Sequence, residues 1–252
     1  EEQVGAEVAK FCKLLKAVYH DFGFDELVVK FSTMPEDHVG DLETWQRAEK
    51  ALADACHEAG LEYELQPGEG AFYGPKLEFK LYDCIGREWQ CGTIQADFQL
   101  PSAERLDATY IGKDNQKHHP VMLHRAILGS FERFLGILIE NFAGAFPTWL
   151  AFEQVAVVPV STEFDDYAKK VNDLLVSHDI RSNVYLGDEN MKAKIKNIST
   201  EHRTPYILVV GQNEKDSETV TCRYRFSSKK PQETFKLDDF VKDADHPASK
   251  LK

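Results

Sequence analysis

Residues 89–100 read WQCGTIQADFQL, and this segment decides the fold of the first half of the chain. Apolar and polar residues alternate along it, which is typical of a strand with one buried face. Strict alternation puts residues on two faces: Gln90, Gly92, Ile94, Ala96 and Phe98 on one, and Cys91, Thr93, Gln95, Asp97 and Gln99 on the other. Thr93, Gln95 and Asp97 are then either half solvated or the polar lining of a small-molecule site, because hydroxyl and amide groups hydrogen-bond small substrates.

The segments around this strand have the same period of two. Alternation recurs in LEYEL (61–65), LEFKLYD (77–83) and RLDATYIG (105–112), and ELVVKFST (26–33) is a β-branched strand. Before and between them, residues 1–22 and 42–59 have apolar positions at helical spacing and stop at Gly23 and Gly60. The sequence therefore predicts an antiparallel sheet with helices.

A glycine-rich loop, GEGAFYGPKLEF (68–79), joins two of these strands. Small residues allow a ligand to approach the backbone closely, and Tyr73 and Lys76 are the side chains that would meet it. A plain hairpin connection is the alternative.

The segment MLHRAILGSFERFLG (122–136) turns from an extended strand into a helix at Gly129 and Ser130. Free backbone N–H groups at a helix start attract anions, and Arg133 would lie beside them. An arginine on a solvated helix face is the alternative. The helix is expected to bury one broad apolar face, made of Ile127, Leu128, Phe131, Phe134, Leu135, Leu138 and Phe142.

Three histidines lie close together in HHPVMLH, namely His118, His119 and His124. Imidazoles this close in sequence seldom converge in tetrahedral geometry, and the run contains no Asp or Glu. A zinc site made from these three alone is therefore disfavoured.

Gly144 and Pro147 mark a junction, after which strands alternate with helices. The expected strands are QVAVVPV, RSNVYL, YILVVG and TVTCRYRF, and the expected helices are DDYAKKVNDLLVSHD, a segment near 189–202 and DDFVKDA. This pattern predicts a small α/β domain with parallel pairing.

Composition limits the function classes. The formal net charge is −12, but residues 1–150 hold 25 acidic and 14 basic side chains whereas residues 151–252 hold 17 and 16, so the second half is the expected place for any nucleic-acid contact. Five cysteines without a Cys-x-x-Cys pair argue against a disulfide framework and favour a reducing cytoplasm. No apolar run predicts a membrane span, no signal-peptide pattern is present, and the absence of an initiator Met predicts a longer parent chain.

Taken in order, FYGPK, WQCGTIQ and LHRAILGSFERF, followed by an α/β tail after FPTWLA, resemble the threonyl-tRNA synthetases of class II. The resemblance is weakest over 187–204 and after Phe226. It implies an α+β fold: the antiparallel class II sheet with helices over residues 1–150, then a smaller α/β anticodon-binding domain with a mixed sheet over 151–252. It also implies ATP with Mg²⁺, L-threonine and tRNA(Thr) as substrates and partners.

The resemblance assigns residue roles. Arg133 would be catalytic and contact the adenine and triphosphate of ATP, and Ser130 would line the same site. Gln90, Thr93 and Gln95 would contact the adenylate and the terminal adenosine of the tRNA. Tyr73 would lie against the substrate threonine, and Lys76, also assigned to the threonine site, would be the partner of a carboxylate or a phosphate.

His124 would be one of three ligands of a Zn²⁺ ion that separates threonine from valine through the hydroxyl group. In relatives the other two ligands, motifs 1 and 2 and the editing domain precede the point where this sequence starts. The isolated chain is therefore expected not to aminoacylate, and the homodimer of the family, built chiefly on motif 1, is not assured for it.

For the anticodon, the expected contacts are Lys192, Lys194, Lys196, Asn197, Arg203, Arg223 and Arg225, each of which has a solvated charged face as its alternative. Two rival functions remain: a non-catalytic synthetase-like module that binds tRNA or a partner, and an ordinary small-molecule α/β protein. The proline, glycine and histidine enzymes share the tail, so threonine specificity depends on the three quoted motifs.

Overall fold

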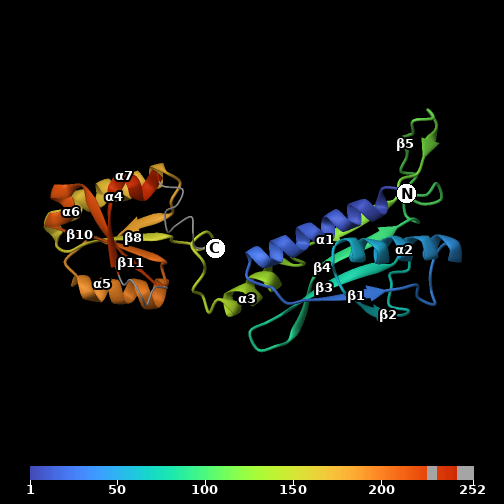
Figure 1. Ribbon diagram of the computed structural model, residues 1–252, viewed down its shortest axis with the longest axis horizontal. Helices are drawn as coiled ribbons and strands as arrows, with labels where there is room; N and C mark the ends of the chain where they lie inside the picture. Colours follow the sequence, from blue (N-terminus) through green and yellow to red (C-terminus); the bar gives the residue numbers. More distant parts are fainter. Residues whose placement is uncertain (226–231, 243–252) are drawn as a thin grey trace. The chain divides into compact units, whose positions relative to one another are not determined.

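A computed structural model describes residues 1–225 and 232–242. The chain forms two compact units, Glu1–Asn141 and Phe142–Lys252 (Figure 1). Each has its own sheet, so each is described by itself.

The first unit contains a five-stranded sheet in the order β2-β1-β3-β4-β7. Neighbours from β1 to β7 pair antiparallel, as the alternation predicted, while β2 joins β1 in parallel. The strands are β1 (Leu27–Ser32), β2 (Glu64–Gln66), β3 (Lys76–Tyr82), β4 (Glu88–Asp97) and β7 (Met122–Ala126).

Two helices, α1 (Val4–Asp21) and α2 (Leu42–Glu58), pack on one face of this sheet. Their ends follow local signals: Gly23 adopts φ +82° after α1, and the Asp41 side chain accepts the backbone N–H of Thr44 at the start of α2. Beneath them Phe79 and Ile94 are fully buried, and the Phe79 ring meets that of Phe11 edge to face at 6.1 Å. The opposite face carries the polar residues of the strands.

Strand β4 contains a bulge. Phe79 of β3 pairs with Gly92 and Lys80 pairs with Gln90, so Cys91 has no partner of its own. An extra residue reverses the alternation on one side of it. The strict alternation that grouped Gln90 with Gly92 and Ile94 is therefore wrong: Gln90 lies on the polar face, where its amide nitrogen donates to Thr93 Oγ1 at 3.0 Å.

Two further predictions for the first unit are corrected. Residues 105–112 do not join the sheet; β5 (Tyr110–Ile111) pairs instead with β6 (Lys117–His118) in a separate hairpin. Helix α3 (Phe131–Asn141) starts after Ile127 and Leu128, and it buries Phe134, Ile137 and Leu138 while Phe131 and Leu135 stay exposed. Its buried face is thus narrower than the apolar pattern suggested.

The second unit has a mixed sheet in the order β12-β11-β10-β8-β9. Strand β8 (Val155–Pro159) pairs in parallel with β9 (Ser182–Val184) and β10 (Tyr206–Val210); β11 (Thr219–Tyr224) and β12 (Gln232–Lys236) complete it antiparallel. Parallel strands in the centre require cover on both faces. Helix α4 (Asp165–Ser177) covers one face and α5 (Met191–Asn197) the other.

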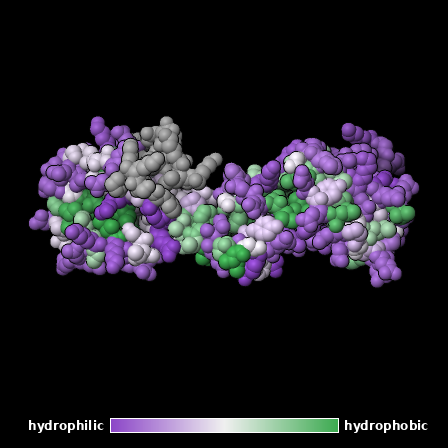
Figure 2. Space-filling model, turned by 60° about the horizontal axis from the view of Figure 1, so that its bottom comes forward, coloured by the Kyte–Doolittle hydropathy of each residue, from purple (hydrophilic) through white to green (hydrophobic). Residues whose placement is uncertain are grey.

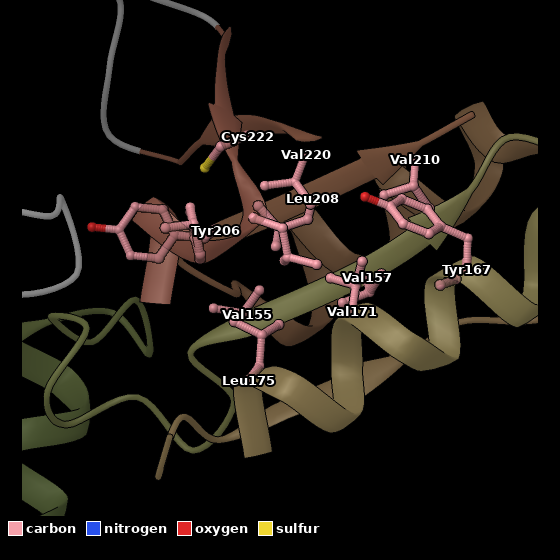
Figure 3. Packing of buried hydrophobic residues seen from close by; sticks show 13 residues of the cluster. Val155, Val157, Tyr167, Val171, Leu175, Tyr206, Leu208, Val210, Val220 and Cys222 are labelled. Carbon is pink, nitrogen blue, oxygen red and sulfur yellow. The ribbon is translucent and has the colours of Figure 1, made fainter. Parts of the chain in front are cut away.

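Figure 3 shows the core under α4, where Val171 and Leu175 meet Val155 and Val157 of β8. The alternate residues Ala156 and Val158 are equally buried but pack toward α5. A continuous apolar run such as QVAVVP is the expected signature of a strand buried on both faces.

Several elements of the second unit were not predicted. Strand β12, the short 3₁₀ segment Thr162–Phe164 and α6 (Gln212–Ser217) lack a clear periodic signal, and the helix near 189–202 divides into α5 and a π-helical stretch, Ile198–His202. The final helix is described as α7 (Leu237–Lys242). Its expected last residues, 243–244, and Phe226 of the predicted last strand lie outside the described residues.

Surface and thiol chemistry agree with the composition. Hydrophilic side chains cover most of the visible face, with apolar patches between them (Figure 2). All five cysteines are free, and only Cys84 is exposed. Among the described residues, no helix is both long and apolar enough to cross a membrane.

The hydroxyl of Tyr19 on α1 donates to the carbonyl of Ile127, just after β7, at 2.6 Å. Tyr19 is buried, and burial raises the pKa of its phenol, so it stays a donor. Tyr19→Phe should lower the free energy of unfolding of the first unit by about 1–3 kcal/mol, because the carbonyl loses its partner. Urea unfolding measures this; Tyr110→Phe, on the exposed hairpin, should change nothing, and equal effects would contradict the assignment.

Candidate active site

The polar face of the first sheet brings together most of the site residues expected in the first unit. Cross-strand neighbours share a face, so Lys76, Gln95 and His124, which lie in register on β3, β4 and β7, point the same way. Thr93 and, through the bulge, Gln90 join them on β4. The candidate site is therefore a row of side chains across three strands.

Three of these residues form one contact group at the C-terminal end of β4. Tyr73 donates its hydroxyl to Gln95 Oε1 at 2.6 Å, and its ring centroid lies 5.3 Å from that of His124. Burial, and secondly the charge of Asp97, raise the pKa of the Tyr73 phenol, which keeps it a hydrogen-bond donor. The group offers a hydroxyl, a side-chain amide and an imidazole to a small polar ligand.

Close backbone packing places Tyr73 there. The loop before β3 turns back through a bridge between Ala71 and Gly74. A Cβ on Gly74 would lie 2.0 Å from the carbonyl oxygen of Ala96, so only glycine allows the loop to lie against β4. On the other side, a Cβ on Gly70 would lie 2.5 Å from the carbonyl of Thr33.

Arg133 lies at the other end of β4. Its guanidinium donates to the carbonyl of Gln90 at 3.1 Å and stands 5.7 Å from the centroid of the Trp89 ring. Ser130 accepts the backbone N–H of Arg133 and so caps the start of α3. Gly129, at φ +67°, brings this turn against the bulge, since its Cβ position is 3.0 Å from the Cys91 carbonyl oxygen.

The structure thus does not bring Arg133 into contact with the group formed by Tyr73, Gln95 and His124. Tyr73, Gln95 and His124 touch, whereas Arg133 meets β4 at Gln90, five residues earlier in the strand. At about 3.3 Å per residue this is a separation of about 16 Å along the strand. A ligand that reaches both groups must be extended.

Charge is distributed unevenly along this face. The lysines of the sheet are paired with acids: Lys76 with Glu78 at 2.8 Å, Lys80 with Glu88 at 3.3 Å, and Lys30 with Glu64. No carboxylate partner of Arg133 is recorded among the described residues. The exposed guanidinium and the start of α3 therefore make this end the favourable one for an anion.

The histidine run does not form a metal centre. His118 pairs with Asp114 in the β5–β6 hairpin and His119 with the carbonyl of Ala108, away from His124. The described part of the chain contains no group of three or more His, Cys, Asp or Glu that could hold a metal ion. His124, with Asp97 Oδ2 at 2.9 Å from its Nε2, fits one ligand position and its supporting carboxylate, and nothing more of a zinc site.

The residues expected to contact an anticodon differ in exposure. Lys192, Lys196 and Asn197 are exposed on α5, but Lys194 is buried and its ammonium donates to the carbonyls of Tyr185 and Gly187. The geometry of Lys194 favours a structural role, which is neither the expected anticodon contact nor the solvated charged face that was its alternative.

The three arginines of that set are also placed differently. Arg203 and Arg225 donate to the carbonyls of Ala143 and Phe146, respectively, at the start of this unit. Burial, and secondly the charge of Arg203, lower the pKa of Arg225 to about 10. Arg223 is exposed on β11.

Comparisons with known proteins match this division of the chain. Residues 1–142 match the family model of the tRNA synthetase class II core domain (G, H, P, S and T), and residues 154–244 match that of the anticodon binding domain. The chain belongs to the class II aminoacyl-tRNA synthetases. Its fold class, an antiparallel synthetase sheet followed by a smaller mixed-sheet α/β domain, is the one predicted.

Individual relatives of this synthetase chain are named threonine-tRNA ligases. One from Wolbachia sp. subsp. Drosophila simulans is 55% identical over 96% of the chain, and one from Treponema pallidum is 53% identical over 95%. A crystal structure described as the RNA binding domain of threonyl-tRNA synthetase from Cryptosporidium parvum superimposes with a TM-score of 0.88, at 38% identity, over 95% of this chain and 59% of that one. The chain spans only 37% and 40% of the length of the first two relatives.

The role of one residue of the candidate site, Asp97, was predicted only in part from the sequence. Asp97 was placed on the polar face, but its contact with His124, 27 positions along the chain, depends on the register of β4 with β7. No local signal fixes that register.

Gly74→Ala should separate Tyr73 from Gln95, because a Cβ 2.0 Å from a backbone oxygen forces the loop away from β4. We expect a large shift of the Gln95 side-chain amide resonances in NMR spectra and a loss of stability. The control is Gly136→Ala in α3, where a Cβ meets nothing within 4 Å and should stabilise the helix by about 0.5–1 kcal/mol. Unchanged Gln95 resonances in Gly74→Ala would contradict this role of the glycine.

Proposed function

We propose that this chain is the C-terminal part of a threonine-tRNA ligase, with residues 1–150 completing the catalytic domain and residues 151–252 recognising the anticodon. The observation that supports it best is the group Tyr73, Gln95 and His124 in a chain 53–55% identical to enzymes of that name. The complete protein would activate threonine with ATP and transfer it to tRNA(Thr).

The chemistry of the group suits threonine. Threonine and valine have the same shape, so an apolar pocket separates them poorly, whereas a site that hydrogen-bonds the hydroxyl rejects the analogue without it. The Tyr73 hydroxyl and the Gln95 amide are paired with each other and half-buried, which holds both in place for a polar ligand. Lys76, directly across from Gln95, is the nearest cation in the strand register for a carboxylate.

Activation requires stabilisation of charge on phosphoryl oxygens. We assign ATP, with its Mg²⁺, to the end of β4 near Arg133 and Ser130, where the guanidinium and the start of α3 favour an anion. Gln90 and Thr93 lie between this end and Tyr73, so they would line the adenylate. Arg133 is the proposed catalytic residue.

We also assign His124 as one zinc ligand, with the remaining ligands supplied by residues outside this chain. When bound, zinc would add an open coordination position for the amino and hydroxyl groups of threonine. Dimerisation of the complete protein and a location in the cytoplasm belong to the same proposal.

A second function is favoured by the incomplete set of catalytic groups. With a single arginine identified for ATP, the chain alone would act as a tRNA- or partner-binding module. Exposed Lys192, Lys196, Asn197 and Arg223 are the groups available for tRNA phosphates and bases. In both functions the second unit would bind tRNA, so a measurement of catalytic activity distinguishes the ligase from the binding module.

A chimera tests the catalytic role. This chain replaces the matched region of the Treponema pallidum relative, and threonine-dependent ATP–pyrophosphate exchange is measured. We expect exchange from the chimera and none from the 252-residue chain alone. Tyr73→Phe should reduce the preference for threonine over valine about tenfold, the equivalent of one lost hydrogen bond.

Tyr82→Phe, at the far end of β3 on the same face, is the matched control and should leave the preference unchanged. A folded chimera without exchange would overturn the proposal. Exchange by the isolated chain would show that the catalytic set is complete.

Binding of tRNA(Thr) by the 252-residue chain tests the second unit. Lys192→Ala and Lys196→Ala should each lower the slope of log affinity against log salt by about one, because each lost phosphate contact releases one ion fewer. Lys169→Ala, an exposed lysine on α4, is the control. Salt slopes equal to the control would place the tRNA elsewhere.

A further inference from the structure

Asp97 is a carboxylate held rigidly in the interior of the first unit. It lies at the end of β4 and is fully buried. Its Oδ1 accepts the backbone N–H groups of Gln99 and Leu100, both at 2.9 Å. These two bonds fix the plane of the carboxylate, and Oδ2 lies 2.9 Å from Nε2 of His124.

This contact decides which imidazole nitrogen carries the proton. An ionised carboxylate only accepts hydrogen bonds, and its other oxygen already receives two backbone donors. Nε2 of His124 must therefore be the protonated nitrogen, which leaves Nδ1 with its lone pair when the ring is neutral. The alternative is a protonated Asp97 that donates to Nε2, and it predicts the opposite tautomer, with Nε2 as the unprotonated nitrogen.

Nδ1 is the nitrogen that remains for a ligand. No hydrogen bond to it is recorded among the described residues, and the His124 side chain is 34% exposed. The Tyr73 ring lies beside the imidazole, with its hydroxyl held by Gln95. The ring is thus fixed through Asp97 and flanked by the group proposed to bind threonine.

We propose that Asp97 is a positioning residue that fixes the tautomer and orientation of His124, so that Nδ1 is presented as an unprotonated nitrogen ligand. A carboxylate behind a histidine acts in this way at metal sites, where it sets the tautomer and raises the basicity of the ligand. The inference rests on the proposed role of His124 as a ligand of the threonine site, but the tautomer can be measured without any metal.

Asp97→Asn is the sharpest test. The backbone N–H groups of Gln99 and Leu100 still require an acceptor, so the amide oxygen should stay with them and the NH₂ group should turn to His124. An NH₂ group donates, so Nε2 becomes the acceptor and the proton moves to Nδ1. The substitution keeps shape and volume but reverses the tautomer.

The measurement is long-range ¹H–¹⁵N correlation NMR of the 252-residue chain labelled in histidine, recorded at rising pH until the His124 resonances no longer change and the ring is neutral. His124 should show an unprotonated Nδ1 in the wild type and an unprotonated Nε2 in Asp97→Asn. The matched control is Asp114→Asn, which faces Nε2 of His118 on the exposed hairpin and should leave the His124 pattern unchanged.

Two results would overturn the proposal: a wild-type His124 with its proton on Nδ1, or an unchanged tautomer in folded Asp97→Asn. The wild-type spectrum alone decides the matter if the variant does not fold. In the chimera, Asp97→Asn should weaken zinc binding about 10- to 100-fold. A correct tautomer in a chimera that binds no zinc would contradict the zinc assignment while leaving the positioning role intact.

Discussion

The extra residue in β4 is the constraint on which the candidate site depends. With Cys91 unpaired, Cys91 and Gly92 both lie on the buried side, and Gln90 moves to the face that carries Thr93 and Gln95. Without the bulge, Gln90 would point into the helices. The bulge also exposes the backbone that α3 uses, because Gly129 packs on the Cys91 carbonyl and Arg133 binds that of Gln90.

On the other face of β4, a second glycine, Gly92, allows α1 to pack closely against the strand. A Cβ on Gly92 would lie 2.6 Å from Leu15 and 2.7 Å from the hydroxyl of Tyr19. Its absence lets the Tyr19 phenol pass below the sheet and bind the carbonyl of Ile127. Helix α1 thereby holds the turn between β7 and α3, which contains Ser130 and leads into the first turn of α3, where Arg133 lies. Packing on the apolar face and geometry on the polar face are thus coupled through β4.

The sequence predicted the elements whose signals are local. Helices α1 and α2 have amphipathic spacing and glycine stops, and β3 and β4 alternate, so their existence and approximate ends followed from the residues. The bulge in β4 could not be predicted in this way, because it depends on how β3 and β4 pair. Residues 105–112 alternate as a sheet strand does, but it is β7 that pairs with β4. No local feature of the sequence decides which of these two segments pairs there.

The candidate site residues could be identified from local sequence signals, but the contacts between them could not. Residue types and motifs identified Tyr73, Gln95, His124 and Arg133, yet their contacts join positions as far as 51 apart in sequence and could not be read from it. In the second unit, Lys192, Lys194 and Lys196 look equivalent in the sequence. Only the fold shows that Lys194 differs from its exposed neighbours, because its ammonium group donates hydrogen bonds to two backbone carbonyls.

The two ends of the polar face of the first sheet differ in charge. Where Tyr73 and Gln95 meet, the nearest strand cation, Lys76, is paired with Glu78, so hydrogen-bonding groups are what this end offers a ligand. At the Arg133 end, the exposed guanidinium and the start of α3 are positive, and no acid partner of Arg133 is recorded in the part of the chain that the structure describes. A neutral polar group discriminates hydroxyl-bearing ligands, and a positive end stabilises phosphate charge. Tyr73 binds β4 at Gln95 and Arg133 binds it at Gln90, so the length of this strand sets the distance between the two points of attachment.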